Sequence, residues 1–127
     1  MGQQQLLLII LGVIIVGIAI AVGLSLFSAQ SIQSNRDAMI NDLNNLAAQA
    51  YQFRIRPISM GGGQGDYSTF SIPLKMRTNE NATYTAAPGT TTISFTAVSA
   101  QNPSNTIQVT IDSDGRLSGW SYTGDFQ

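Results

Sequence analysis

The residues with the clearest potential for chemistry form the run Asp112-Ser113-Asp114-Gly115. Two carboxylates one residue apart match the start of a calcium-binding loop, so Asp112 and Asp114 are candidate metal ligands. Such a loop would end in a glutamate, whereas this chain has Tyr122-Thr123 at that place. Because Asp-Gly is also a standard turn between paired strands, the sequence favours a hairpin turn, with calcium binding as the alternative.

Catalysis lacks its usual side chains in this sequence, which contains neither cysteine nor histidine. This excludes thiol nucleophiles, the usual zinc sites, Ser-His-Asp triads and imidazole bases. Only 10% of the residues are charged, the net charge is −1, and Lys and Arg are scattered along the chain. Nothing therefore indicates a nucleic-acid surface. We expect no enzyme activity, no cofactor and no nucleic-acid partner.

Two further motifs each have a functional and a purely structural interpretation. Asn81-Ala82-Thr83 is a glycosylation sequon in a region rich in Ser and Thr, so Asn81 is a candidate glycan site, although the triplet is common by chance. The glycine-rich run 60–66 follows a predicted helix instead of opening one, and no Lys-Ser/Thr comes after it. We therefore predict a flexible connector there, not a phosphate-binding loop.

The element that precedes these motifs is apolar, and the first charge in the chain is Arg36. From Leu6 to Phe27, 16 of 22 residues are Leu, Ile, Val or Phe. A helix of this length spans roughly 33 Å, which matches a bilayer core of about 30 Å. A cleavable signal peptide fits poorly, because no basic residue precedes the run, the run is too long, and Phe27-Ser28-Ala29 lacks a small-x-small site. The segment is expected to remain in the mature protein.

The helical pattern continues beyond the apolar run. No Pro or Gly lies between Phe27 and Pro57. Apolar residues recur at alternating spacings of three and four and form a stripe: Ile32, Met39, Leu43, Leu46, Ala50 and Phe53. Arg36 occupies the one interrupted position of this stripe, and Ile40, Ala47 and Tyr51 widen it. Asp42 and its polar neighbours lie mostly off this stripe. The pattern predicts an amphipathic helix over 28–56 that ends before Pro57.

In the remainder of the chain, apolar and polar residues alternate as they do in half-buried strands. We predict strands at 70–77, 82–86, 93–97, 107–111 and 116–122. Pro73 places the first of them at an edge or at an irregularity, and Gly119 marks a bulge in the last. The predicted fold class is α+β, with a long helix packed through its stripe on an antiparallel sheet of four or five strands. The predicted domains are the apolar helix 1–27 and a globular head 28–127, whose sheet covers 67–123.

This arrangement resembles that of type IV pilins and pilin-like proteins, from the apolar helix through its amphipathic continuation and linking loop to the small sheet. The resemblance implies a subunit that waits in the inner membrane and is then built by the pilus assembly machinery into an extracellular filament of identical subunits. It also implies N-terminal methylation and a role in adhesion, motility or DNA uptake. The alternatives are a pseudopilin of a secretion system and a single-pass anchored binding domain that does not polymerise.

The residues that the resemblance assigns to assembly lie in the first 27 positions: Gln3, Gln4, Gln5, Leu6, Leu7, Ile10, Gly12, Ile14, Gly17, Ala21, Gly23 and Phe27. The glycines resemble the helix-weakening residues of pilins, or they allow close helix approach, as in Gly17–Ala21. Pilins carry a basic leader and a glutamate at mature position five. Here cleavage after Gly2 would place Leu7 there, and retention of Met1 would place Gln5 there. The three glutamines either set the register between neighbouring subunits through hydrogen bonds or simply lie at the membrane surface.

Overall fold

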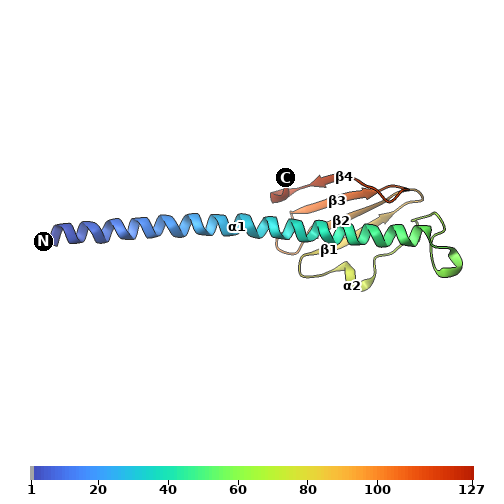
Figure 1. The fold of residues 1–127 in the computed structure, drawn as a ribbon, viewed down its shortest axis with the longest axis horizontal. Helices are drawn as coiled ribbons and strands as arrows, with labels where there is room; N and C mark the ends of the chain where they lie inside the picture. Colours follow the sequence, from blue (N-terminus) through green and yellow to red (C-terminus); the bar gives the residue numbers. More distant parts are fainter. Residues whose placement is uncertain (1) are drawn as a thin grey trace. The chain divides into compact units, whose positions relative to one another are not determined.

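The computed structural model describes residues 2–127, and it has the predicted α+β class (Figure 1). Its elements in chain order are the helix α1 (Gly2–Ile55), the 3-10 turn η1 (Ile58–Met60), the short helix α2 (Leu74–Arg77), the strands β1 (Ala82–Pro88), β2 (Ile93–Ser99), β3 (Thr106–Ile111) and β4 (Leu117–Tyr122), and the 3-10 turn η2 (Gly124–Phe126). The chain divides into two compact units, residues up to Gln33 and Ser34–Gln127.

α1 ends within one residue of the predicted position. Its last helical residue is Ile55, two residues before Pro57. The ring of a proline crowds the residue before it and disfavours the helical conformation there. Because no Pro or Gly interrupts positions 28–56, nothing stops the helix earlier.

The glycine-rich segment after α1 caps the helix, whereas its composition predicts a loose connector. Backbone amides of Gly63, Gln64 and Gly65 donate to the carbonyl oxygens of Phe53, Arg56 and Arg54 at 2.9, 3.0 and 2.5 Å. Carbonyl groups at the end of a helix have no helical amide to accept from, so these bonds satisfy them. Glycine permits the close approach, since a Cβ on Gly63 would lie 1.9 Å from the Asp66 carbonyl oxygen.

Gly63→Ala should therefore destabilise the folded unit 34–127 by about 1–3 kcal/mol, because the added methyl group forces the backbone of the cap apart. The measurement is urea unfolding of the full chain in detergent, monitored through the near-ultraviolet circular dichroism of its single tryptophan, Trp120. Ser59→Ala, at an exposed position of the preceding turn, is the matched control and should change stability by less than about 0.5 kcal/mol. Equal stability of the two variants would contradict the capping role.

The sheet has four antiparallel strands in the order β1-β2-β3-β4. Strands predicted at 82–86, 93–97, 107–111 and 116–122 are all confirmed, with ends shifted by one or two residues. The bulge predicted at Gly119 is also confirmed. Gln108 lies opposite Ser121 and Thr110 opposite Ser118, so β4 carries one residue more than β3 at this point.

The predicted fifth strand over residues 70–77 is wrong, and the sheet begins at Ala82. Phe70 and Ile72 are buried, as their alternation predicts, but Leu74 is 79% exposed and opens α2. Pro73 has no amide to donate to a neighbouring strand, and its φ of −55° suits the start of a helical turn. A short alternation of apolar and polar residues is equally compatible with an irregular segment that places two side chains in the core.

The apolar stripe on α1 covers one face of the sheet, as the sequence predicts (Figure 1). Met39, Leu43, Leu46, Ala47 and Ala50 are buried on the helix. The sheet supplies the residues that alternate inward on its strands: Ala82, Tyr84, Ile93, Phe95, Ala97, Ile107, Val109 and Ile111. The rings of Phe53, Phe70 and Phe95 form successive edge-to-face contacts with centroids 5.4 and 6.1 Å apart, which tie the helix and the irregular segment to the sheet.

Two polar residues of α1 lie within this packed face. The Arg36 guanidinium lies 4.5 Å from the centroid of the Tyr122 ring, so a cation–π contact lets a charge occupy the stripe. Asn35 is buried, where its Nδ2 donates to the Asn81 carbonyl at 3.1 Å and its Oδ1 accepts from the Ser99 hydroxyl at 2.6 Å. These bonds offset the cost of burying the amide.

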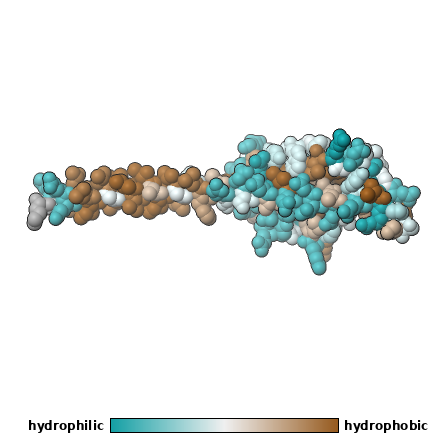
Figure 2. Space-filling model, in the orientation of Figure 1, coloured by the Kyte–Doolittle hydropathy of each residue, from teal (hydrophilic) through white to brown (hydrophobic). Residues whose placement is uncertain are grey.

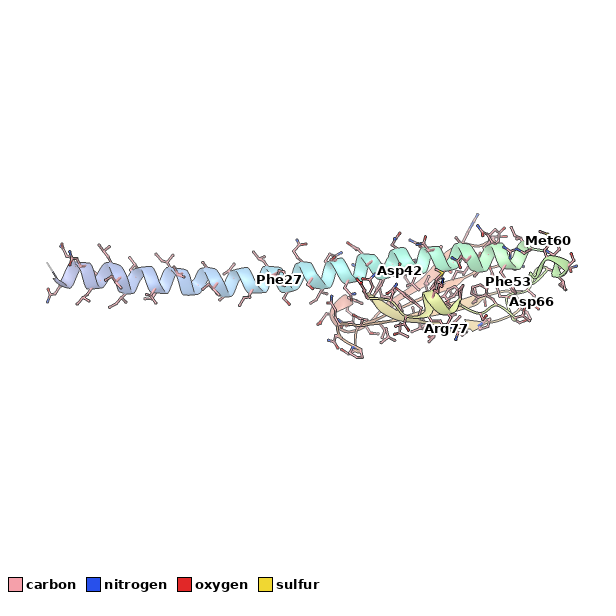
Figure 3. The ribbon with its side chains drawn as sticks, turned by 90° about the horizontal axis from the view of Figure 1, so that it is seen from below. Phe27, Asp42, Phe53, Met60, Asp66 and Arg77 are labelled. Carbon is pink, nitrogen blue, oxygen red and sulfur yellow. The ribbon has the colours of Figure 1, made fainter. Side chains whose placement is uncertain are left out.

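Asp42 also faces the sheet, although its position is predicted to lie off the stripe (Figure 3). Its Oδ2 accepts hydrogen bonds from the Tyr84 hydroxyl, Asn79 Nδ2 and Asn81 Nδ2 at 2.5, 2.9 and 3.4 Å. Burial, followed by the hydrogen bond to the Asp42 carboxylate, raises the pKa of the Tyr84 hydroxyl. Burial likewise raises the pKa of Tyr67, whose hydroxyl donates to the Asp112 carbonyl at 2.8 Å.

The unit 34–127 should accordingly lose stability at alkaline pH. An unfolded tyrosine loses its proton near pH 10, whereas Tyr84 in the folded state keeps its proton to a higher pH. The folded state then binds more protons, so the free energy of unfolding falls as pH rises above about 10, by at most about 1.4 kcal/mol per pH unit for one such group. Urea unfolding at several pH values should show that the free energy of unfolding falls less steeply with pH in Tyr84→Phe than in the original chain. The fall should be smaller still when Tyr67→Phe is added. An unchanged slope in the double variant would contradict this.

Candidate assembly surface

The candidate site is the apolar part of α1, residues 6–27. All of these residues are exposed, and the large apolar side chains range from 50% exposed at Leu11 to 73% at Phe27. Figure 2 shows this part of the helix as an almost uninterrupted hydrophobic surface. Within residues 2–127, α1 is the one helix that is long and apolar enough to cross a membrane.

An exposed surface of this kind needs a cover. Soluble monomers rarely expose contiguous apolar patches larger than a few hundred Å². Each buried Val, Leu, Ile or Phe side chain gains about 1.5–3 kcal/mol over its exposed state, and this segment has 16 of them. The segment can satisfy this demand in a lipid bilayer or against other apolar helices.

Small residues interrupt this surface at positions where the described part of the chain packs nothing against them. At Gly12, Gly17 and Gly23, an added Cβ would meet nothing within 4 Å. α1 runs unbroken through all three. Gly17 and Ala21 lie one turn apart, so they form a shallow strip on one helix face that allows the backbone of a neighbouring helix to come close.

The three glutamines, Gln3, Gln4 and Gln5, lie in the first turns of α1 and are exposed. The first turn of α1 contains no acidic residue that could accept from its free backbone amides. The expectations about Met1, leader cleavage and methylation concern a residue outside those that the structure describes.

Asp112 is used in a turn between β3 and β4. Its Oδ1 accepts from the backbone amides of Asp114 and Arg116, both at 2.9 Å, and its carbonyl accepts from Gly115 at 3.1 Å. These bonds, above all the one from Arg116, lower the pKa of the Asp112 carboxyl. Among residues 2–127, no group of three potential metal-ligating side chains is found. The geometry is that of a hairpin turn, with Asp114 exposed at its tip.

Asn81, the candidate glycan site, is half-buried at the start of β1. Its Nδ2, the atom to which a glycan would be attached, donates to Asp42, and its carbonyl accepts from Asn35 and from the Ala100 amide. A glycan would have to displace the bond to Asp42. Glycosylation stays a prediction.

A second exposed apolar cluster, which the stripe pattern alone does not predict, is formed by Ile55, Ile58 and Met60 at the end of α1. These side chains are 58%, 67% and 69% exposed. Figure 3 shows Met60 in the turn that follows the helix. The sequence feature that could have predicted this cluster is the continuation of apolar residues past Phe53, where the stripe on α1 ends.

Comparison of the chain with known proteins gives no match to a family model, a curated protein or a solved structure. The architecture itself is pilin-like, with a long N-terminal apolar helix packed, in its second part, on a four-stranded antiparallel sheet.

Proposed function

We propose that this chain is a structural subunit of an extracellular type IV pilus-like filament, which polymerises through residues 6–27. The observation that carries the proposal is a long helical surface that is apolar, uncharged and exposed around its whole circumference. A surface of this kind can contact several neighbours at once. Identical subunits that meet through different faces of one helix form head-to-tail contacts, and such contacts generate open helical polymers when their rotation does not close into a ring.

The unit 34–127 supports this role because its core does not depend on the apolar segment. Its helix stripe and sheet face bury each other, and its buried Asn35 and half-buried Asp42 have hydrogen-bond partners. A subunit can then move from membrane to filament with its head intact. In this proposal the partners are the inner membrane before assembly, the pilus assembly machinery, and identical subunits.

The physical basis of specific assembly is packing. Lipid tails are as apolar as leucine side chains, so no hydrophobic driving force favours helix contacts over lipid contacts. Close contacts at small residues such as Gly12, Gly17 and Gly23 favour helix association instead. Once the heads lie outside the cell, exclusion of the apolar segments from water holds the polymer together.

The second candidate function is a single-pass anchor that displays a binding domain and never polymerises. The same helix favours it, because its length and composition suit a bilayer. The two candidates differ in the state of the protein after secretion, and one experiment separates them.

That experiment is cryo-electron microscopy of material sheared from cells that make this protein. The proposal expects filaments whose core consists of helices traceable as the apolar part of α1, with the four-stranded sheets outside. If shearing releases no filament and all of the protein stays with the membrane, the anchored-domain candidate replaces the proposal.

A further inference from the structure

β1 is an edge strand of the sheet, and its outer side is largely unpaired. The Asn81 carbonyl accepts from Ala100 on the side of β2, whereas the Ala82 carbonyl accepts from Asn79 on the opposite side. Because backbone groups alternate sides along an antiparallel strand, the amide and carbonyl of Ala86 also point away from β2. Within residues 2–127, an isolated bridge at Thr83 is the last pairing on this outer side, and neither backbone group of Ala86 has a partner there.

A groove of about 310 Å³ lies beside this free edge. Phe70 and Ile72 line it on the side of the irregular segment, and residues Tyr84 to Ala86 line it on the side of β1. It therefore occupies the place where a strand over 70–77 would have paired with β1. Because Pro73 turns the chain into α2 instead, the position next to β1 is left vacant.

The mouth of the groove is positively charged. Arg77 lines it, with its Nε held by the Ile72 carbonyl at 3.0 Å, and Lys75 is exposed on the same short helix. No ion pair with either cation is found in the part of the chain that the structure describes. The nearby carboxylate of Asp42 instead accepts the hydrogen bonds of Tyr84 and Asn79. An anionic group in the groove would thus meet Arg77, for which no ion pair is found among residues 2–127, whereas Lys75 lies beside Asp42 in a neighbouring pocket.

We propose that this groove binds an extended acidic segment of another protein, which pairs with Ala86 and adds a fifth strand to the sheet. Main-chain hydrogen bonds to the edge of β1 would give affinity, as in other cases of strand addition. An apolar side chain of the segment packs against the small exposed parts of Phe70 and Ile72, and a carboxylate meets Arg77, with Lys75 on the same short helix adding to the positive charge nearby. This inference concerns a ligand of the head and holds whether or not the chain polymerises.

The shape of the edge limits the length of the added strand. Asn79 and Thr78 occupy the outer side of β1 at its start, and Pro88, which has no amide, lies at its end. Only a short stretch is therefore available, so binding should be modest in affinity and should weaken as salt screens the exposed cations.

The test uses the full chain in detergent micelles and two fluorescein-labelled peptides, Thr-Val-Glu-Val-Thr and its counterpart Thr-Val-Lys-Val-Thr. Fluorescence anisotropy should show that the glutamate peptide binds at least about fivefold more tightly at low salt. The double variant Lys75→Gln, Arg77→Gln should abolish this preference. Equal binding of the two peptides to the unsubstituted chain, or binding of neither, would overturn the proposal.

The strand pairing is tested by Ala86→Pro, which removes the outward amide without removing a bond to β2. Proline is tolerated at edge strands, so the fold should persist, as judged by the near-ultraviolet signal of Trp120. Binding of the glutamate peptide should fall about tenfold or more, whereas Ala87→Ser, whose amide faces β2, should leave it unchanged. Unaltered binding to a folded Ala86→Pro variant refutes strand addition. If that variant does not fold, amide chemical shifts of β1 on titration decide, since pairing must move the resonance of Ala86.

Discussion

Replacing residues 6–27 by an unrelated apolar helix of equal length should abolish filament formation while the protein stays in the membrane. Insertion into a bilayer depends on total hydropathy, which the replacement keeps. Packing in a helical polymer depends on which side chains lie where, and the replacement changes those positions. The measurements are the amount of subunit in the sheared fraction and in the membrane fraction, each by immunoblot.

The reason for a large effect is the placement of small residues. Gly12, Gly17, Ala21 and Gly23 leave hollows in a surface made mostly of Leu, Ile, Val and Phe; among residues 2–127, a Cβ added at the three glycines would meet nothing within 4 Å, and Ala21 is exposed. A helix that fills these hollows keeps its neighbours farther apart and loses many weak van der Waals contacts together. A single substitution Gly17→Leu should reproduce most of the loss.

Ile14→Leu is the matched control, because it keeps the volume and the hydropathy at an exposed position of the same segment. It should leave the sheared fraction within about twofold of the original. Two outcomes would count against the proposed function: filaments that survive the full replacement, or an original chain that never appears in the sheared fraction.

Phe95→Ala should have the second large effect, a loss of about 3–5 kcal/mol in the free energy of unfolding of the unit 34–127. Phe95 is fully buried in β2, between Ala86 of β1 and Val109 of β3, and its ring meets that of Phe70. Its truncation leaves a cavity beneath α1 that the rigid sheet cannot close. Since domains of this size have about 5–15 kcal/mol in total, the variant should be close to unfolding at growth temperature.

Thr96→Ala is the control for this prediction, because the next residue of the same strand faces the opposite side of the sheet and is partly exposed. Its stability should change by less than about 0.5 kcal/mol. Urea unfolding of the full chains in detergent compares the two variants. A similar loss in both would mean that α1 does not cover the face of the sheet that carries Phe95.

The two predictions separate assembly from folding. The replacement of residues 6–27 should leave the unfolding of the head unchanged, because the core of that unit is made of residues from Asn35 onward. Phe95→Ala should reduce the amount of subunit in both the membrane and the sheared fractions, since cells degrade unfolded heads.

Properties that depend on neighbouring residues along the chain follow from the sequence. The length of α1 is one of them, because it reflects a long stretch without Pro or Gly and a stop at Pro57. The four strands are another, since their apolar residues alternate and turn residues separate them. The exposed apolar surface also follows from composition, because the sequence offers one apolar stripe and one apolar sheet face, which leaves residues 6–27 without a third apolar surface among residues 2–127.

Properties that depend on distant residues were decided by the tertiary structure. Asp42 meets Tyr84, which is 42 positions away, and only the packing of α1 on β1 turns an exposed-looking carboxylate into a hydrogen-bond centre. Apolar and polar residues alternate over 70–77 as in a strand. A strand must also donate its backbone amides to a neighbour, however, and Pro73 has no amide hydrogen. The same missing pairing leaves the groove beside β1. Helix ends and strand periods are local in origin, whereas a pairing, a buried polar contact or an open edge exists only once remote segments meet.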